Sequence, residues 1–388
     1  MNKKKIILLI NSFWAIPAVF IIRIINILQP IRIIKIRSDR FGHFAPDGAE
    51  QVARHQFEKK NINLYIFDWD ICNKQWAKML KSSLPVYNWL RFVFFWNKFI
   101  PGGDEINQTG TKTSSRDTHL LYTRYDVKLK FSIQENNTVK QWLQNKGWRE
   151  GEPFYCLLIR DNYYLKNNPQ YKNVDFSYHE YRNSDLKTYY KSIKWLTKRG
   201  IWVIRMGKEM SSSLEISDSK VIDFPFDKYK SDLIDTWLFA NCSGCISTGT
   251  GPDILSGIYD KNILFLNYLP LFTLRSDLKS ITYPKKLIWE KTQKEFSIDE
   301  YISDKRIRME DYKQDSIKII DMTEFEILHA VKEFYRINNN KFIENHKTKT
   351  LREKFWKKVL IENKKHNKNV HFKIHPESRP GISWIQKF

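Results

Sequence analysis

The segment "CISTGTGPDILSG", residues 245–257, joins a short apolar run to a turn of small residues, and an apolar pattern resumes at Ile254. The pattern predicts a strand at 244–248 that turns through the small residues into a helix. Backbone N–H groups at the start of a helix favour an anion, and Gly249 and Gly251 allow a ligand to approach closely. The loop has neither the GKS or GKT ending of a P-loop nor a GxGxxG pattern after the first strand, which disfavours ATP and NAD.

The rest of the chain alternates strand and helix patterns, which is typical of α/β domains with parallel sheets. Strands are predicted at 31–38, 62–68, 154–161, 201–207, 220–226, 244–248 and 262–268, and helices from about Gly48 and at 73–83, 132–148 and 183–200. The repetition predicts two Rossmann-like domains facing a cleft, with an N-terminal apolar segment. The predicted division is an anchor at 1–30, an N-terminal domain at 31–150, a C-terminal domain at 151–340 and a basic tail at 341–388.

The 388-residue chain is strongly basic, with 65 Lys and Arg against 43 Asp and Glu and a net charge of +22. Such a balance fits a solvated basic surface, an anionic membrane surface, a polyanionic substrate or nucleic acid. Nucleic acid is disfavoured because no zinc-finger spacing, helix-turn-helix signature or ribonucleoprotein motif is present. Cys242 and Cys245 form a lone CxxC without further ligands nearby, which predicts ordinary buried cysteines.

The first thirty residues are basic and then apolar, and Arg23 interrupts the apolar run. A spanning helix needs about 20 apolar residues, which this stretch reaches only if Arg23 extends its charge to the interface. Basic residues flank the run on both sides, so the charge rule gives no orientation. The pattern favours a membrane-embedded anchor that does not clearly cross, and a core helix of a soluble protein is the alternative.

Ligands of open α/β sheets bind beyond the carboxyl ends of the strands. Basic and small residues gather at these predicted ends in the second half of the chain. They are Arg160, Arg182, Asn183, Arg205, Gly207, Ser247, Thr248, Gly249, Thr250 and Gly251. Because an arginine can grip a phosphate with two hydrogen bonds, the set predicts a diphosphate site. Any one of these arginines could instead form a surface ion pair, and the turn could be a simple helix cap.

These features resemble the GT-B-fold glycosyltransferases. The STGTG loop is similar to the donor-phosphate loop of heptosyltransferases, and "CLLIRD" (156–161) resembles the strand-then-Arg segment of fucosyltransferases. The order of "RFGHFA" (40–45), "LLIRDNYYL" (157–165) and "VIRMG" (203–207) also resembles a bacterial family of glycosyltransferases linked to surface polysaccharides. The resemblance implies transfer from a nucleotide-diphosphate sugar to a glycan or lipid-linked acceptor, with inversion, without a metal or cofactor, at the cytoplasmic face of the cell membrane.

The resemblance also implies a catalytic base in the N-terminal domain. His43 follows Gly42 after the first strand, and imidazole has a suitable pKa near 6.5. Asp47 and Glu50 are the alternatives, and a structural histidine is another. Asp68-Trp69-Asp70 has the letters of a metal-binding DxD pair, but it lies in the half of the chain away from the donor loop. A non-catalytic nucleotide-sugar or carbohydrate-binding protein on the same scaffold is the competing function.

Overall fold

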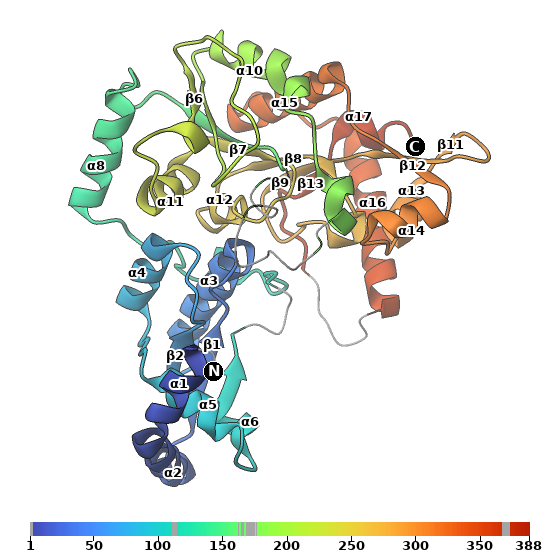
Figure 1. The fold of residues 1–388 in the computed structure, drawn as a ribbon. Helices are drawn as coiled ribbons and strands as arrows, with labels where there is room; N and C mark the ends of the chain where they lie inside the picture. The colour runs from blue at the N-terminus through green and yellow to red at the C-terminus, as the bar shows by residue number, and fades with distance from the viewer. Residues whose placement is uncertain are drawn as a thin grey trace. The chain divides into compact units, whose positions relative to one another are not determined.

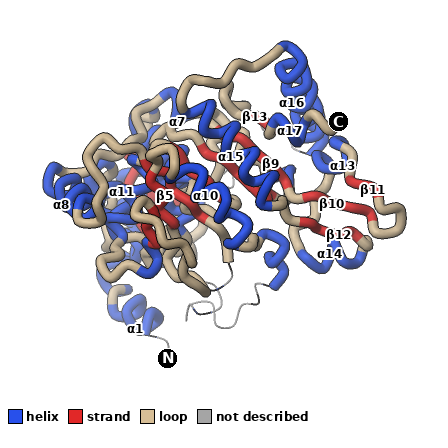
Figure 2. Tube along the Cα trace, turned by 90° about the horizontal axis from the view of Figure 1, so that it is seen from above, coloured by secondary structure: helices blue, strands red, loops and turns tan. Residues whose placement is uncertain are grey.

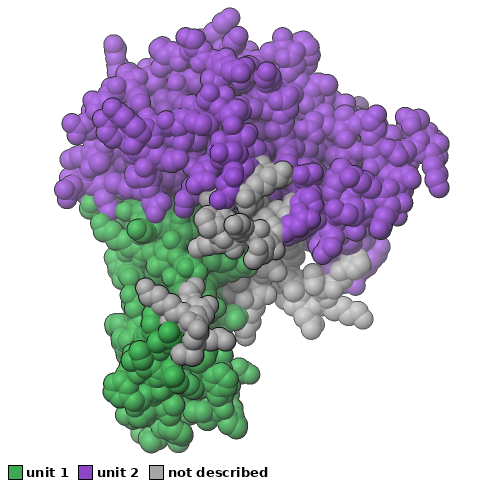
Figure 3. Space-filling model, in the orientation of Figure 1, with its two compact units in different colours: residues 1–117, 121–132 green, residues 118–120, 133–388 purple. Residues whose placement is uncertain are grey.

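The computed structural model describes residues 3–110, 115–161, 163, 167, 175, 177–366 and 373–388. The chain divides into two compact units, coloured separately in Figure 3. Unit 1 comprises 1–117 and 121–132, and unit 2 comprises 118–120 and 133–388. Each is built of helices around parallel strands, which confirms the predicted α/β class.

The sheet of unit 1 has three parallel strands in the order β2-β1-β3. Strand β1 (Ile31–Ile36) lies between β2 (Ile62–Phe67) and β3 (Asn107–Thr109) and carries buried isoleucines on both faces, as is typical of a central parallel strand. The helices of unit 1 are α1 (Lys3–Ile10), α2 (Ser12–Leu28), α3 (Phe41–Phe57), α4 (Lys74–Ser83), α5 (Leu90–Asn97), α6 (Gly103–Ile106) and α7 (Leu121–Arg124).

Helix α2 packs one of its faces into the core of unit 1. Its Val19, 1% exposed, joins a cluster that contains Ile33 of β1 and Val93 of α5. Arg23 does not extend toward an interface, because its guanidinium donates to Asn97 Oδ1 at 2.9 Å and to the carbonyl of Pro101 at 2.7 Å. Within the described residues, no helix is both long enough and apolar enough to cross a bilayer.

Helix α3 begins earlier than the sequence predicts. The sequence places a loop before about Gly48, whereas α3 starts at Phe41 and continues through Pro46. Gly42 and Pro46 are poor helix formers. They are tolerated because Phe44, Ala49 and their neighbours are fully buried, so tertiary packing of the helix overrides propensity. His43 and Asp47 therefore lie on a helix rather than in a loop.

The main sheet of unit 2 has seven parallel strands in the order β13-β9-β8-β7-β4-β5-β6. The strands are β4 (Phe154–Leu158), β5 (Trp202–Arg205), β6 (Val221–Asp223), β7 (Gly244–Ser247), β8 (Ile263–Tyr268), β9 (Ser280–Pro284) and β13 (Arg379–Pro380). The chain starts at β4, adds β5 and β6 on one side, then returns to add β7, β8 and β9 on the other. The point of reversal lies between β4 and β7, and such a point is where doubly wound sheets bind ligands.

Helices cover both faces of this sheet. In Figure 1, α10 (Tyr190–Thr197) and α15 (Glu324–Asn338) lie on one side of the strands, and α11 (Asp232–Asn241) and α12 (Ile254–Ile258) lie on the other. Figure 2 shows α10 and α15 crossing the strands from above. The region that the sequence predicts as helix 183–200 contains the 3₁₀ segment η3 (Leu186–Tyr189) followed by α10, and the 3₁₀ segment η2 (Ser177–Arg182) precedes it.

Further elements extend unit 2 at both of its sequence ends. Helix α8 (Ile133–Gln144), which the sequence placed in the first domain, belongs here, and its Asn136 accepts a 2.9 Å hydrogen bond from Trp237. A second sheet contains β10 (Lys286–Trp289), β11 (Lys294–Glu295) and β12 (Ile317–Ile320), and the remaining elements are η4 (Phe224–Phe226), η5 (Leu271–Thr273), α13 (Ile298–Ser303), α14 (Met309–Gln314), α16 (His346–His366) and α17 (Ile382–Ile385).

The C-terminal segment after 341, predicted as a basic tail, packs onto unit 2. Phe355 and Trp356 of α16 are buried, and so is Trp384 of α17. Arg379 and Pro380 pair with β9 as the last strand of the sheet. The high density of lysines conceals these few apolar contacts in the sequence pattern.

The packing of α2 gives a stability prediction. Replacing Val19 by alanine removes buried methyl groups beside Ile33 and Val93, so Val19→Ala should lower the free energy of unfolding by about 1–3 kcal/mol. The adjacent Phe20 is 52% exposed, and Phe20→Ala should change that free energy far less. Urea denaturation of both variants checks this, and equal effects of the two substitutions would contradict the packing of α2.

Candidate functional site

Two turns at the carboxyl ends of β4 and β7 are tied together by hydrogen bonds. The side chain of Thr248 accepts from the backbone N–H of Arg160 at 3.0 Å, and the N–H of Thr248 donates to the carbonyl of Leu158 at 3.1 Å. Thr248 is 2% exposed, so these bonds are shielded from water. These two hydrogen bonds place the residues that follow β4 beside the STGTG loop, as the sequence predicts.

The amides of the STGTG loop are occupied from within the loop. Asp253 accepts from the N–H of Thr250 at 3.0 Å and from that of Gly251 at 3.2 Å, while Ser247 Oγ accepts from Gly249 at 3.0 Å and donates to Asp253. The sequence analysis expects these amides to hold an anion, but in this structure they cap a carboxylate of the chain itself. Asp253 has a recognisable signal, an acidic residue after Pro252 at the start of a short helix.

The positive charge at this edge of the sheet comes from Arg160 and Arg182. Arg182 donates to the carbonyl of Gly249, and the Nε atom of Arg160 is buried without a hydrogen-bond partner. Among the described residues, neither guanidinium forms an ion pair with a carboxylate. Burial and the neighbouring charge of Arg182 lower the pKa of Arg160 to about 9, so Arg160 is still cationic at neutral pH. Two cations held side by side favour an anion with more than one charge.

Two more polar atoms lie buried in this region without partners, Oγ1 of Thr250 and Oδ1 of Asn183. The backbone carbonyl of Asn183 accepts from Lys285 at 2.5 Å. Buried polar atoms are nearly always hydrogen-bonded in folded proteins, so these atoms and Arg160 Nε are available to a ligand. A hydroxyl and an amide beside two guanidiniums suit a phosphate and its attached sugar.

Arg205 and Gly207 have other partners. Arg205, 2% exposed, donates to the carbonyl of Ser212 at 2.6 Å and pairs with Asp223 at 3.4 Å, so its charge is already compensated. Gly207 has φ +149°, and a Cβ there would lie 2.6 Å from the sulfur of Met210. Both residues therefore shape the end of β5, and we leave them out of the anion site.

In unit 1, His43, Ser115 and Asp47 form a chain of polar groups. His43 Nδ1 lies 2.7 Å from Ser115 Oγ, and the same hydroxyl hydrogen-bonds Asp47. Asp47 is 1% exposed and Ser115 is 4% exposed. Ser115 lies 72 residues from His43 in the sequence, and no spacing signals the pairing. The site residue that the sequence analysis misses in unit 1 is therefore Ser115.

The titration behaviour of the pair follows from its burial. Desolvation raises the pKa of Asp47 to about 7, and desolvation with the charges of Arg37 and Arg40 lowers the pKa of His43. When Asp47 is ionised, Ser115 donates to it and accepts from Nδ1–H of His43. His43 Nε2, which has no partner among the described residues, then carries the lone pair of a base.

Glu50 and Asp68 have cationic partners. Glu50 is 6% exposed and accepts from Arg54 at 2.8 Å one turn along α3, and Asp68 pairs with Lys35 at 2.7 Å. Their charges are compensated within unit 1, which makes Glu50 a weaker candidate base than His43 or Asp47. Within the described parts of the chain, no cluster of three or more His, Cys, Asp or Glu could hold a metal ion.

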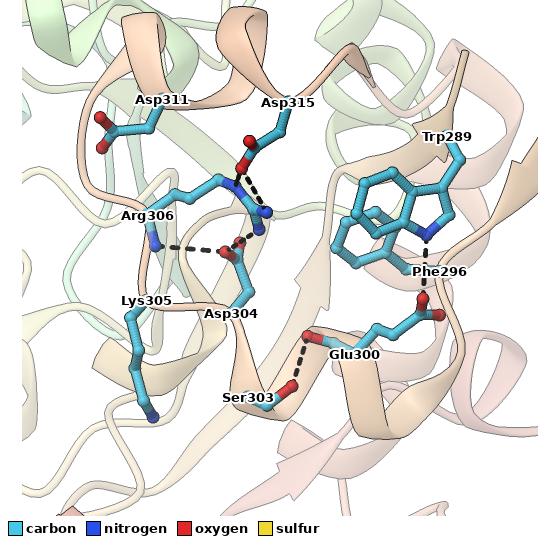
Figure 4. A pocket seen from close by; sticks show the side chains of 9 residues that line it. All are labelled: Trp289, Phe296, Glu300, Ser303, Asp304, Lys305, Arg306, Asp311 and Asp315. Atoms are coloured by element: carbon cyan, nitrogen blue, oxygen red, sulfur yellow. Dashed lines mark hydrogen bonds and ion pairs between the residues drawn. The ribbon is translucent and has the colours of Figure 1, made fainter. Parts of the chain in front are cut away.

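A separate pocket of about 550 Å³ lies in unit 2 beside the second sheet (Figure 4). Arg306 is held there between Asp304 at 2.7 Å and Asp315 at 2.6 Å, and Trp289 donates to Glu300 at 2.9 Å. None of the predicted site residues lines this pocket. Its only arginine is neutralised by its neighbours, so it offers less to an anion than Arg160 and Arg182 do.

No protein-family model and no curated protein matches the sequence. The chain is similar to a crystal structure of a glycosyl transferase family 9 protein from Veillonella parvula DSM 2008. The two are 12% identical, the match covers 79% of this chain and 97% of that chain, and the TM-score is 0.46.

The raised pKa of Asp47 predicts how stability depends on pH. The folded protein keeps the Asp47 proton up to about pH 7, whereas the unfolded chain loses it near the ordinary aspartate pKa of 3.8. Burial of this group therefore reduces stability progressively as pH rises across that window. Asp47→Asn, which stays neutral, should gain of the order of 1–3 kcal/mol relative to wild type between about pH 4 and pH 8.

Thermal unfolding at a series of pH values tests this expectation. The matched control is Asp104→Asn, because Asp104 is an exposed carboxylate on α6 of the same unit. That variant should follow the wild-type pH profile. A constant stability difference between Asp47→Asn and wild type at every pH would show that Asp47 is ionised throughout the range.

Proposed function

We propose that the protein is a glycosyltransferase that moves a hexosyl or deoxyhexosyl group from a nucleotide-diphosphate sugar to a glycan or lipid-linked acceptor. The proposal includes inversion at the sugar carbon, no metal or cofactor, and action at the cytoplasmic face of the cell membrane. Unit 2 holds the donor in this proposal, and unit 1 supplies the base. The observation that carries it is the pair of guanidiniums at the reversal point of the seven-stranded sheet, without a carboxylate partner among the described residues.

The chemistry of this pair suits a leaving diphosphate. As the acceptor oxygen bonds to the anomeric carbon, the bond from that carbon to the phosphate oxygen breaks, and the electron pair stays on the diphosphate. Arg160 and Arg182 would stabilise the charge that develops there, as preorganised donors do in other transferases. Thr250 Oγ1 would add a hydroxyl donor to the same group.

The acceptor hydroxyl must lose a proton in the same step, and His43 is the proposed base. Its lowered pKa leaves the imidazole neutral at pH 7, and the Ser115–Asp47 chain fixes which nitrogen keeps its proton. As His43 becomes cationic, an ionised Asp47 behind Ser115 would stabilise the charge. We prefer His43 to Glu50 as the base because the carboxylate of Glu50 is paired with Arg54.

Binding of a nucleoside diphosphate tests the donor site directly. Arg160→Ala and Arg182→Ala should each weaken binding by about 1.5–3 kcal/mol, the scale of a hydrogen bond to a charged group. Affinity for the nucleoside without phosphates should not change. Titration calorimetry provides both numbers, and Arg199→Ala is the control because Arg199 is an exposed arginine of the same unit. Unchanged diphosphate affinity in both site variants would remove these arginines from the site.

Turnover separates an enzyme from a binding protein. With a panel of nucleotide sugars, mass spectrometry should detect transfer or donor hydrolysis, and His43→Ala should reduce the rate by roughly 10²–10⁴. Donor affinity should stay close to wild type in that variant. Ser115→Ala should show a smaller loss and a shifted pH profile, because it breaks the link to Asp47. Near-normal turnover of His43→Ala beside an inactive Asp47→Asn would make the carboxylate the base.

A further inference from the structure

The N-terminal helices of unit 1 have a second apolar face that no described residue covers. On α2 the residues at one side of the helix pack into the core, and those at the opposite side are exposed apolar residues at spacings of three and four. The exposed side chains include Phe13 at 76%, Phe20 at 52%, Ile21 at 58%, Ile24 at 64% and Leu28 at 87%. A helix that is apolar on all sides belongs in a protein core or in a membrane.

The exposed surface continues beyond α2, and we call the whole surface the N-terminal apolar face. On α1, Leu9 is 59% exposed and Ile10 is 63% exposed. Phe99, 68% exposed, lies with its ring centroid 5.9 Å from that of Trp96, whose indole N–H donates to the carbonyl of Leu8 at 3.4 Å. This many exposed large apolar side chains on three segments of one unit is typical of an interaction surface.

The charged residues around this face indicate which kind of partner it binds. The first acidic residue of the chain is Asp39, whereas Lys3, Lys4 and Lys5 begin the sequence of α1 and Arg32 follows α2. At the far end of α2 the carbonyl of Lys60 accepts from the side chain of Gln29 at 3.1 Å, which places the exposed pair Lys59 and Lys60 beside Leu28. An apolar face with basic margins is complementary to the surface of an anionic bilayer.

The geometry excludes a spanning arrangement for α2. Its 17 residues cover about 25 Å, less than the roughly 30 Å of a hydrocarbon core. Its other face is packed on the core of unit 1, and Arg23 is held by the carbonyls of Ile100 and Pro101. A helix attached along its whole length to a folded unit can enter a membrane only sideways.

We propose that unit 1 binds anionic membranes through the N-terminal apolar face, with α2 lying in the plane of the interface and its exposed side chains in the acyl region. The exposed Lys59 and Lys60 beside the end of α2 contact the phosphate groups of the lipids. This inference rests on the surface of unit 1 and does not depend on glycosyl transfer.

Flotation of the full chain with lipid vesicles tests the proposal. The protein should bind phosphatidylcholine vesicles that contain phosphatidylglycerol, bind pure phosphatidylcholine vesicles more weakly, and lose part of its binding as salt is raised. The triple variant Phe13→Gln, Phe20→Gln and Ile24→Gln should bind at least about tenfold more weakly. Because these side chains are exposed, its melting temperature and its nucleoside diphosphate affinity should remain those of the wild type.

The control variant replaces three exposed apolar residues of unit 2 by glutamine. Ile133, Phe325 and Ile343 are 81%, 65% and 92% exposed, and their triple replacement by glutamine should leave vesicle binding intact. Equal vesicle binding by both triple variants would overturn the proposal. The proposal would also be overturned if the wild-type protein bound no vesicles and was a dimer in light scattering, while the first triple variant was a monomer. The N-terminal apolar face would then join two copies of the chain.

Discussion

The pairing of β4 with β7 is the constraint on which the candidate donor site depends. These two strands are neighbours in space although β5 and β6 separate them in sequence, so their carboxyl ends bring together turns that lie far apart along the chain. Thr248 locks the two turns through one bond in each direction, to Arg160 and to Leu158. The hydrogen bonds of Thr248 bring Arg160 to the STGTG loop, where Arg182 donates to the carbonyl of Gly249. The local positive charge at this edge of the sheet comes from these two arginines.

The candidate sites of the two units differ in the charges that they hold. In unit 2 the partly buried Arg160, beside a second arginine, lacks a compensating carboxylate among the described residues, which leaves a local excess of positive charge. In unit 1 a buried carboxylate is connected to a histidine through a hydroxyl, and burial raises the pKa of the carboxyl to about 7 while it lowers the pKa of the imidazole. Each arrangement costs folding free energy, and that cost supports the proposal that both positions serve the chemistry of the protein.

The sequence predicts the strands of unit 2 well because central parallel strands are continuous apolar runs, and Arg160 at the end of one such run is readily found. It fails where the outcome depends on distant side chains. The loop amides are taken by Asp253, Arg205 is neutralised by Asp223, and Ser115 reaches His43 from another part of the chain. Helix α3 starts early because buried packing outweighs Gly42 and Pro46, and β13 is too short for a periodic pattern. The spacing of residues in a sequence predicts local structure, whereas these contacts join residues that are distant in the sequence.

The internal cap formed by Asp253 has a consequence for how a ligand would be received. Since Ser247 and Asp253 already hold the loop amides, the loop has its shape before any ligand arrives. The conformational entropy of fixing it is lost during folding, so binding does not incur that loss again. Asp253 also places a negative charge under the loop, which directs an incoming anion away from the amides and toward the guanidiniums. In the proposed site the loop would act as a rigid wall that orients the ligand, and the two arginines would supply the charge that attracts it.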